Sequence, residues 1–133
     1  MKCRIAVQIL LMGLVNLVAA SPAVQDTKVT PLMAKDLAGL TGKEAVMLTV
    51  EYAPGAVSGK HRHNANTFVY VLEGSIVMQV EGGKEVPLGP GQTFYESPTD
   101  VHTVSKNASS SQPAKFLVFF VKDKDAPALV PVK

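Results

Sequence analysis

Hydrophobic and polar residues alternate over short segments through most of the chain. Residues 43–52 show the pattern most clearly, and their apolar side chains fall at every second position: Val46, Leu48, Val50 and Tyr52. This period of two places the apolar side chains on one face of a β strand. Similar segments, separated by Gly and Pro turn signals, follow at residues 67–72, 75–80, 84–88, 93–96, 101–105 and 114–121.

No segment after residue 20 has a helical period, so the pattern predicts an all-β domain, either an antiparallel sandwich or a small barrel. Residues 114–121 are apolar at nearly every position, which is typical of a strand covered on both faces. Residues 21–30 are polar and predict a flexible lead-in. Residues 31–40 fit a helical turn or an irregular edge segment. The expected organisation is a lead-in over residues 21–42, a β domain over 43–122 and a C-terminal tail over 123–133.

The first twenty residues have the layout of a secretory signal peptide. Lys2 and Arg4 precede an apolar run over residues 5–20, which ends in small residues. The run contains two polar residues and is short for a membrane span, which takes about 20 apolar residues. We therefore expect cleavage between Ala20 and Ser21 and export to the periplasm or the cell exterior. The alternative is an uncleaved membrane anchor.

Removal of this leader changes the composition that bears on function. Cys3 is the single cysteine and lies in the leader, so the mature protein would have neither a disulfide nor a thiol nucleophile. The formal charge of +2 also comes from Lys2 and Arg4, and without them 11 basic residues balance 11 acidic ones. A chain without a basic excess is not expected to bind nucleic acid or an anionic membrane surface.

Three histidines, His61, His63 and His102, are the strongest chemical signal in the sequence. His61 and His63 are two residues apart, so both imidazoles project from the same face of an extended strand. His102 can join them if the chain between folds back as sheet. Three imidazole nitrogens are a common ligand set for a transition metal, and they suit iron, manganese, nickel, copper and zinc. The spacing therefore predicts a divalent metal site, and the alternative is three ordinary core or surface histidines.

At these residues the chain resembles the cupin family. The first cupin motif is a Gly, five residues, His-x-His, three or four residues, a Glu, six residues and a Gly. This sequence matches it at Gly55, His61, His63 and Gly74, but Thr67 stands at the position of the Glu.

The second cupin motif has a Pro-x-Gly, a His and, a few residues later, an Asn. Pro98, His102 and Asn107 match it here, although the Gly is missing and the spacing between Pro and His is one residue shorter. The likeness extends over residues 44–121. It implies a cupin-type antiparallel double-stranded β-helix, or jelly-roll barrel, often dimeric, with a metal near its centre.

The resemblance does not imply a single reaction, because cupins include dioxygenases, isomerases, epimerases, decarboxylases, sugar-binding regulators and seed storage proteins. Without the motif Glu, three neutral imidazoles would leave the full charge on the metal and would favour an anionic ligand. Glu96, six positions before His102, is a candidate fourth ligand. The alternative for Glu96 is a solvent-facing residue at a strand end.

Two tyrosines, Tyr70 and Tyr95, are further candidates for the pocket, because a buried phenol needs a hydrogen-bond partner and can orient a substrate. The alternative for both is ordinary packing. Arg62 lies between two histidines and should point to the opposite side of its strand, toward the exterior.

These features predict a small exported cupin that holds one divalent metal through three histidines. We expect dioxygenase-type chemistry on a small, anionic organic molecule, and a homodimer as the assembly. The alternative is a non-catalytic module that captures a small ligand or the metal itself. A third interpretation is a metal-free cupin that works through its dimer surface.

Overall fold

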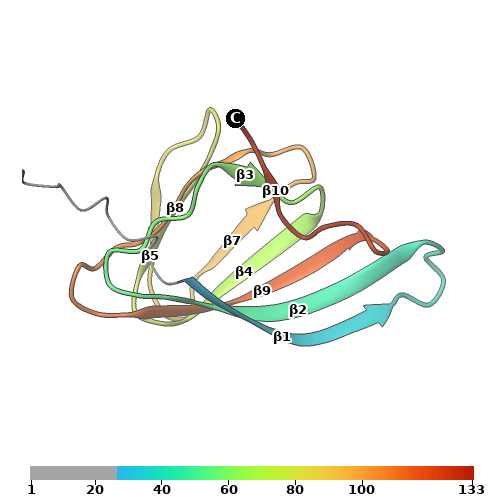
Figure 1. Cartoon of the computed structure of the whole chain (residues 1–133), viewed down its shortest axis with the longest axis horizontal. Helices are drawn as coiled ribbons and strands as arrows, with labels where there is room; N and C mark the ends of the chain where they lie inside the picture. The colour runs from blue at the N-terminus through green and yellow to red at the C-terminus, as the bar shows by residue number, and fades with distance from the viewer. Residues whose placement is uncertain (1–26) are drawn as a thin grey trace, which may run out of the picture.

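In the computed structural model of the protein, two antiparallel five-stranded sheets pack face to face (Figure 1). The structure describes residues 27–133, and the expected signal peptide with its cleavage site lies outside these residues. Every regular element between residues 27 and 133 is a β strand, which confirms the all-β prediction. Over the same residues there is no helix of the length and hydrophobicity that crossing a membrane requires.

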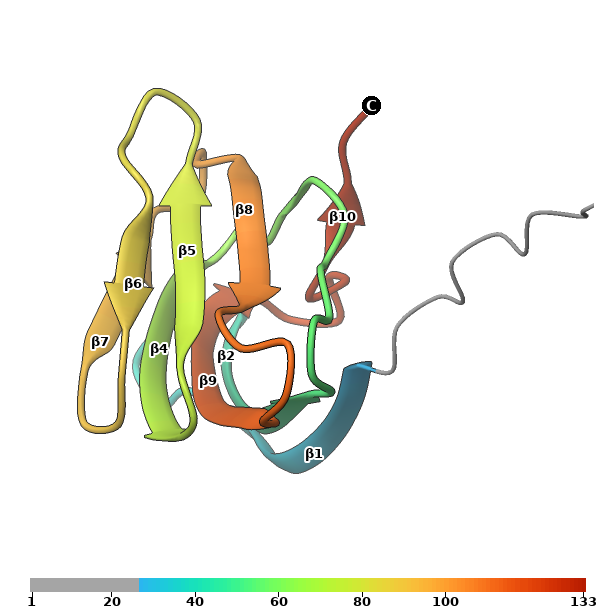
Figure 2. The same ribbon diagram turned by 90° about the vertical axis from the view of Figure 1, so that its left-hand side faces the viewer.

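The first sheet has the strand order β1-β2-β9-β4-β7. Its strands are β1 (Thr27–Asp36), β2 (Lys43–Tyr52), β9 (Ala114–Asp123), β4 (Asn66–Glu73) and β7 (Thr93–Glu96). The second sheet has the order β10-β3-β8-β5-β6. Its strands are β10 (Val130–Pro131), β3 (His61–Arg62), β8 (His102–Asn107), β5 (Ile76–Val80) and β6 (Val86–Leu88). In Figure 2, β6, β5 and β8 lie in front of β7, β4 and β9.

The core fills the space between the two sheets. Alternate residues of β2 and β9 point into it, and the ring of Tyr52 packs edge-on against Phe116 with centroids 5.1 Å apart. Ile76 and Met78 of β5 are fully buried from the other side. Burial of these apolar side chains is the main force that holds the two sheets together. The alternation seen in the sequence of residues 43–52 therefore marks the inner face of β2.

β1 corrects our prediction for the lead-in, because Thr27–Asp36 is a regular strand. It pairs with β2 from Thr27↔Tyr52 to Asp36↔Glu44, with a bulge between Pro31 and Met33. Nearly all of its residues are exposed. An edge strand of this kind takes its register from backbone pairing with β2, so it needs no hydrophobic alternation that the sequence could reveal.

β9 corrects the expectation that its apolar residues are covered on both faces. Its inner residues, such as Phe116 and Phe120, are buried, whereas Leu117 and Phe119 on the outer face are half-buried. These outer side chains are flanked by those of β2 and β4 in the same sheet. Within residues 27–133 no second layer covers that face.

Gly74 and Asn107, the last residues of the two motifs, hold the chain at tight turns. Gly74 has φ of 70°, and a Cβ there would collide with the backbone of Pro113 and Ala114. The Asn107 amide donates hydrogen bonds to the carbonyls of Ala53 (3.1 Å) and Gln112 (2.8 Å). A buried amide that satisfies two loop carbonyls fixes both loops against β8.

Candidate metal centre

Strand pairing brings the three histidines together. β3 begins at His61 and pairs with β8 at His61↔His102, so these two side chains are cross-strand neighbours. The ring centroids of His61 and His63 are 4.8 Å apart, and those of His61 and His102 are 5.0 Å apart. One ring nitrogen from each histidine lies within 4.8 Å of those of the other two. The fold thus gathers a three-nitrogen cluster of the size that a single metal ion could occupy.

Backbone carbonyls fix the tautomers of His61 and His63. The Nδ1 atom of His61 lies 2.7 Å from the carbonyl oxygen of Gly59, and that of His63 lies 2.5 Å from the carbonyl oxygen of Ala128. Since a carbonyl can only accept, each Nδ1 carries the proton and donates it. Both Nε2 atoms therefore keep a free lone pair. Metal-binding histidines commonly donate their other ring N–H to a carbonyl in this way, and the hydrogen bond orients the ring.

Burial also keeps these imidazoles neutral. The loss of hydration lowers the pKa of His61 and of His63 below the ordinary histidine value, more than the nearby backbone carbonyls raise it. Only a neutral imidazole can bind a metal, because the ligand lone pair must not be protonated. Burial therefore favours the form of both side chains that can act as a ligand.

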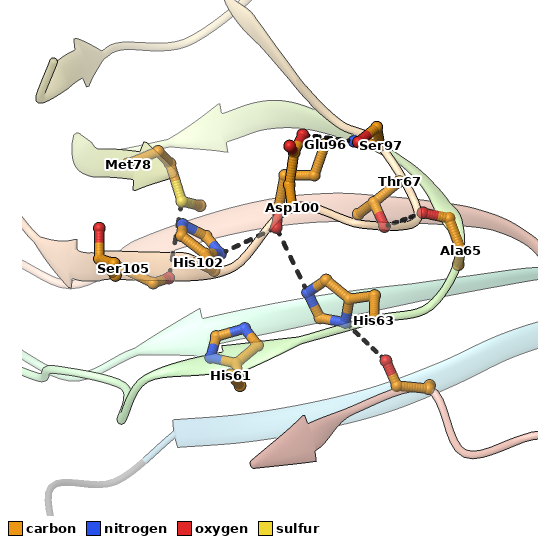
Figure 3. A network of polar contacts seen from close by, with 12 residues as sticks. His61, His63, Ala65, Thr67, Met78, Glu96, Ser97, Asp100, His102 and Ser105 are labelled. Atoms are coloured by element: carbon orange, nitrogen blue, oxygen red, sulfur yellow. Dashed lines mark hydrogen bonds and ion pairs between the residues drawn. The ribbon is translucent and has the colours of Figure 1, made fainter. Parts of the chain in front are cut away.

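Glu96 joins the cluster from β7 (Figure 3). Its side chain is 3% exposed, and its Oε2 atom lies 3.2 Å from His102 Nδ1 and 3.9 Å from His63 Nε2. Within residues 27–133, neither this oxygen nor either ring nitrogen of His102 has a partner in hydrogen-bond geometry. The alternative of a solvent-facing glutamate is therefore wrong. Buried polar atoms that lack partners are costly, and a shared cation would satisfy them.

The position of Glu96 follows from the register of β4 and β7. Thr67 and Glu96 are cross-strand partners, and both are buried. Thr67 itself only donates a weak hydrogen bond of 3.4 Å to the carbonyl of Ala65. A carboxylate in place of the one that the first motif lacks thus lies on the adjacent strand, at the same level of the sheet.

The four side chains face a partly open cavity of about 170 Å³ between the sheets. Its walls are mostly apolar and include Leu48, Val50, Val69, Met78, Phe116, Val118 and Phe120. The Tyr52 and Ser105 hydroxyls, 2.7 Å apart, are a polar pair on this lining. Burial raises the pKa of Tyr52, so its phenol stays protonated. We missed Tyr52 in the sequence as a pocket residue, although its place in the alternation of residues 43–52 puts it on the inner face.

Tyr70 and Tyr95 do not lie in this cavity. Tyr70 is 44% and Tyr95 50% exposed, and both are on the outer face of the first sheet. The Tyr95 hydroxyl donates to Asn66 Oδ1 at 2.7 Å. Residues 67, 69 and 71 of β4 point inward, so the period of two turns Tyr70 outward. Arg62 is exposed, as its position between two inward-facing histidines predicts.

Comparison with known protein families agrees with the fold described above. A family model described as a cupin domain matches residues 48–120, more than half of the chain. This chain belongs to the cupin family. That assignment confirms the expected jelly-roll fold, and the two sheets described above are those of a cupin.

Proteins that this cupin resembles in sequence or in fold include enzymes. A β-alanine degradation protein of Pseudomonas aeruginosa, BauB, is 32% identical over 71 residues, which cover 52% of this chain and 74% of that protein. The DMSP lyase DddQ of Ruegeria pomeroyi aligns with a TM-score of 0.58 and 22% identity over 66% of this chain and 43% of the lyase. An oxalate oxidase in complex with the substrate analogue glycolate aligns with a TM-score of 0.61 and 24% identity, over 85% of this chain and 57% of that one. This cupin therefore spans only about half the length of these two solved structures.

The residues present in this cupin fit a divalent transition metal. His61, His63 and His102 supply nitrogen, and Glu96 is placed to supply an anionic oxygen. A mixed set of three imidazoles and one carboxylate suits first-row metals. The partnerless buried atoms of Glu96 and His102 are the observation that supports this fit most strongly.

Proposed function

We propose that this cupin binds one divalent transition metal through His61, His63, His102 and Glu96 and catalyses a dioxygenase-type oxidation of a small organic anion. Both atoms of one O₂ molecule would be incorporated into the product, so no other oxidant or reductant is needed. The single observation that carries the proposal is the buried Oε2 atom of Glu96, which lies beside two histidines and has no hydrogen-bond partner in the part of the chain that the structure describes.

When bound, the metal supplies Lewis-acid and redox chemistry. The chain's own contribution is to place the ligands, to set the charge and to exclude water. One carboxylate and three neutral imidazoles leave a doubly charged ion with a net charge of about +1, which attracts an anionic group. The apolar wall formed by residues such as Val50, Val69 and Phe116 gives that attraction a low-dielectric setting.

The relatives support the chemical class of the substrate. The oxalate oxidase acts on a dicarboxylate and was crystallised with glycolate, and BauB is named for the degradation of β-alanine. All three compounds are small carboxylic acids. A cavity of about 170 Å³ whose polar end carries the candidate metal ligands fits molecules of this size and charge.

Oxygen uptake by the metal-loaded protein tests this function. The protein, free of histidine tags, is loaded with Fe²⁺ or with Mn²⁺ and screened against small carboxylates that include oxalate, glycolate and β-alanine. We expect substrate-dependent oxygen consumption, and with ¹⁸O₂ we expect both labelled atoms in the product. His102→Ala protein, treated in the same way, is the control. Oxygen uptake no faster than that of this control with every acid would contradict the proposal.

Capture of a ligand without turnover is a second candidate function. Apart from the four proposed ligands, Tyr52 is the one ionisable side chain among the described residues that line the cavity. Its pKa is raised by burial, so it is a poor general base. Tight binding of an acid to the metal-loaded protein, with no oxygen consumed and no product formed, would favour this second function.

Export and homodimerisation are part of the same proposal. The leader over residues 1–20 supports export, and N-terminal sequencing of the protein from the producing cell tests for a start at Ser21. The exposed aromatic side chains of Phe68, Tyr70 and Tyr95 on the outer face of the first sheet support a homodimer. Sedimentation analysis of the purified protein distinguishes a dimer from a monomer.

A further inference from the structure

The C-terminal residues 127–133, which we call the C-terminal strap, cross the open side of the cavity. Ala128 and Leu129 are part of the cavity lining, and Leu129 is also 48% exposed, so it lies at the mouth. Beyond it, β10 pairs with β3, and the Val132 amide donates to the carbonyl of Lys60 at 3.1 Å. The strap thus forms part of the wall between the cavity and solvent.

The strap also contacts the ligand-bearing segment directly. The carbonyl of Ala128 accepts the 2.5 Å hydrogen bond from His63 Nδ1. That bond leaves His63 Nε2 as the free nitrogen, 3.9 Å from Glu96 Oε2. Pro131 is the cross-strand partner of His61. Removal of the strap would therefore free the His63 ring and expose the backbone that carries His61.

The turn that leads into the strap is firmly anchored on β2. Lys122 is 5% exposed, pairs with Glu44, and donates hydrogen bonds to the carbonyls of Ala126 (2.6 Å) and Asp123 (3.2 Å). The same Glu44 oxygen accepts a 3.2 Å hydrogen bond from the Asp125 amide. A buried, fully paired lysine holds this turn in place.

The strap itself is held much less firmly than the turn before it. Its strand β10 has only two residues. Every residue of the strap is half-buried or exposed. Segments with few buried contacts open at a lower free energy than the core does. A fixed turn followed by a weakly held segment allows that segment to move away from the domain as a unit about the turn.

We propose that the C-terminal strap is a gate for the metal centre that opens about the turn over residues 123–126. When the gate closes, the Ala128 carbonyl positions His63 as a ligand and Leu129 covers the cavity mouth. The inference rests on the proposed metal centre and adds to it a positioning contact and a route of entry.

Zinc exchange measured by stopped flow against a chromophoric chelator separates the two roles of the gate. A chain that ends at Ala126 lacks the Ala128 carbonyl. We expect its Kd for Zn²⁺ to rise about 10- to 100-fold, as when the hydrogen-bond partner of a metal-binding side chain is removed. Leu129→Ala keeps the carbonyl but opens the mouth. We expect it to bind and release Zn²⁺ faster, each about fivefold or more, with an unchanged Kd.

Equal Kd and equal exchange rates in the shortened chain and the chain ending at Lys133 would overturn the gate. If the chain ending at Lys133 binds no Zn²⁺, the proposed metal centre fails instead. Should the shortened chain not fold, hydrogen exchange of the chain ending at Lys133 decides. We expect the amides of Ala128, Leu129, Val130 and Val132 to exchange faster than those of β2 and to slow on addition of Zn²⁺. Exchange unaffected by Zn²⁺ would overturn the gate.

Discussion

Glu96 lies directly opposite Thr67 in the antiparallel pair formed by β7 and β4. Cross-strand partners have their Cβ atoms about 4.5–5.5 Å apart and point to the same face of the sheet. Both side chains are buried, and both line the cavity. The carboxylate missing from the first cupin motif is therefore present in space, one strand away. We therefore propose a metal centre of three nitrogens and one anionic oxygen, rather than three nitrogens alone.

Exchange of the two partners tests whether the carboxylate can act from either strand. Glu96→Gln removes the charge but keeps the shape, and we expect it to weaken Zn²⁺ or Mn²⁺ binding at least tenfold, since a ligand oxygen loses its charge. The double variant Thr67→Glu with Glu96→Thr should recover most of that affinity. Isothermal titration calorimetry measures both.

A matched control for this exchange is Glu81→Gln, which removes the charge of an exposed carboxylate that pairs with Lys60 at the surface. We expect its metal affinity to equal that of the unchanged protein. Full affinity in the Glu96→Gln protein would show that Glu96 is not a ligand. A double variant that binds no better than Glu96→Gln would show that position 67 cannot place a carboxylate on the metal.

His102 is the proposed ligand that completes the cluster from β8, so His102→Ala should lose the metal. Two imidazoles and a carboxylate leave one coordination position unfilled, and we expect bound metal to fall from about one equivalent to near zero after dialysis. Thr103→Ala is the control, because Thr103 is half-buried and its hydroxyl donates to the carbonyl of Gln79 instead. Elemental analysis measures the metal, and stoichiometric metal in the His102→Ala protein would disprove the geometry.

The sequence predicted the fold well where burial sets the pattern. β2 and β7 have the bounds that alternation and turn signals indicated, Lys43–Tyr52 and Thr93–Glu96. β1 and β10 were missed. β1 is an exposed edge strand, and β10 is a two-residue pairing in the tail. Neither requires a hydrophobic period, because backbone pairing with a neighbour that is distant in sequence defines each of them.

The site was predictable only in part for a related reason. The spacing of His61 and His63 is local, so it could be read directly, and the motif pointed to His102. The contribution of Glu96 depends on its register with Thr67, and the contact of His63 with Ala128 spans 65 residues. Tyr70 was misplaced because the inward face of β4 begins at residue 67, which the sequence alone did not fix.

The metal-free protein should lose stability as the pH falls through the ordinary histidine pKa of about 6.5. Burial lowers the pKa of His61 and of His63, so in this range the unfolded chain binds more protons than the folded chain. Stability is then complete above that pKa and declines toward the lower folded pKa values. Urea unfolding in the presence of a chelator, at about pH 7.5 and about pH 5.5, measures the change.

The pH effect needs a control, because carboxylates also titrate at the acidic end. His61→Gln with His63→Gln removes both imidazoles, and this protein should lose less stability between the same two pH values. An identical loss in both proteins would mean that the two histidines do not cause it.

Gly74 should tolerate alanine less well than Gly82 does. Both have positive φ, 70° and 79°. A Cβ on Gly82 meets no atom of residues 27–133 within 4 Å, whereas one on Gly74 meets Ala114 Cα at 2.8 Å. Gly82→Ala should lower the free energy of unfolding by about 1–2 kcal/mol, because alanine is strained in the left-handed conformation. Gly74→Ala should lower the free energy of unfolding by about 1–3 kcal/mol more than that, because its Cβ also overpacks the neighbouring backbone. Urea unfolding measures both, and equal losses would contradict the close approach at Gly74.

Anomalous diffraction from crystals of the protein loaded with Zn²⁺ would locate the ion relative to its four proposed ligands. Four ligands at one ion require distances of about 2.0–2.2 Å. We predict one strong peak at that distance from His61 Nε2, His63 Nε2, a ring nitrogen of His102 and a carboxylate oxygen of Glu96. A fully loaded crystal with no peak between these four side chains, or with a peak that Glu96 does not reach, would contradict the account.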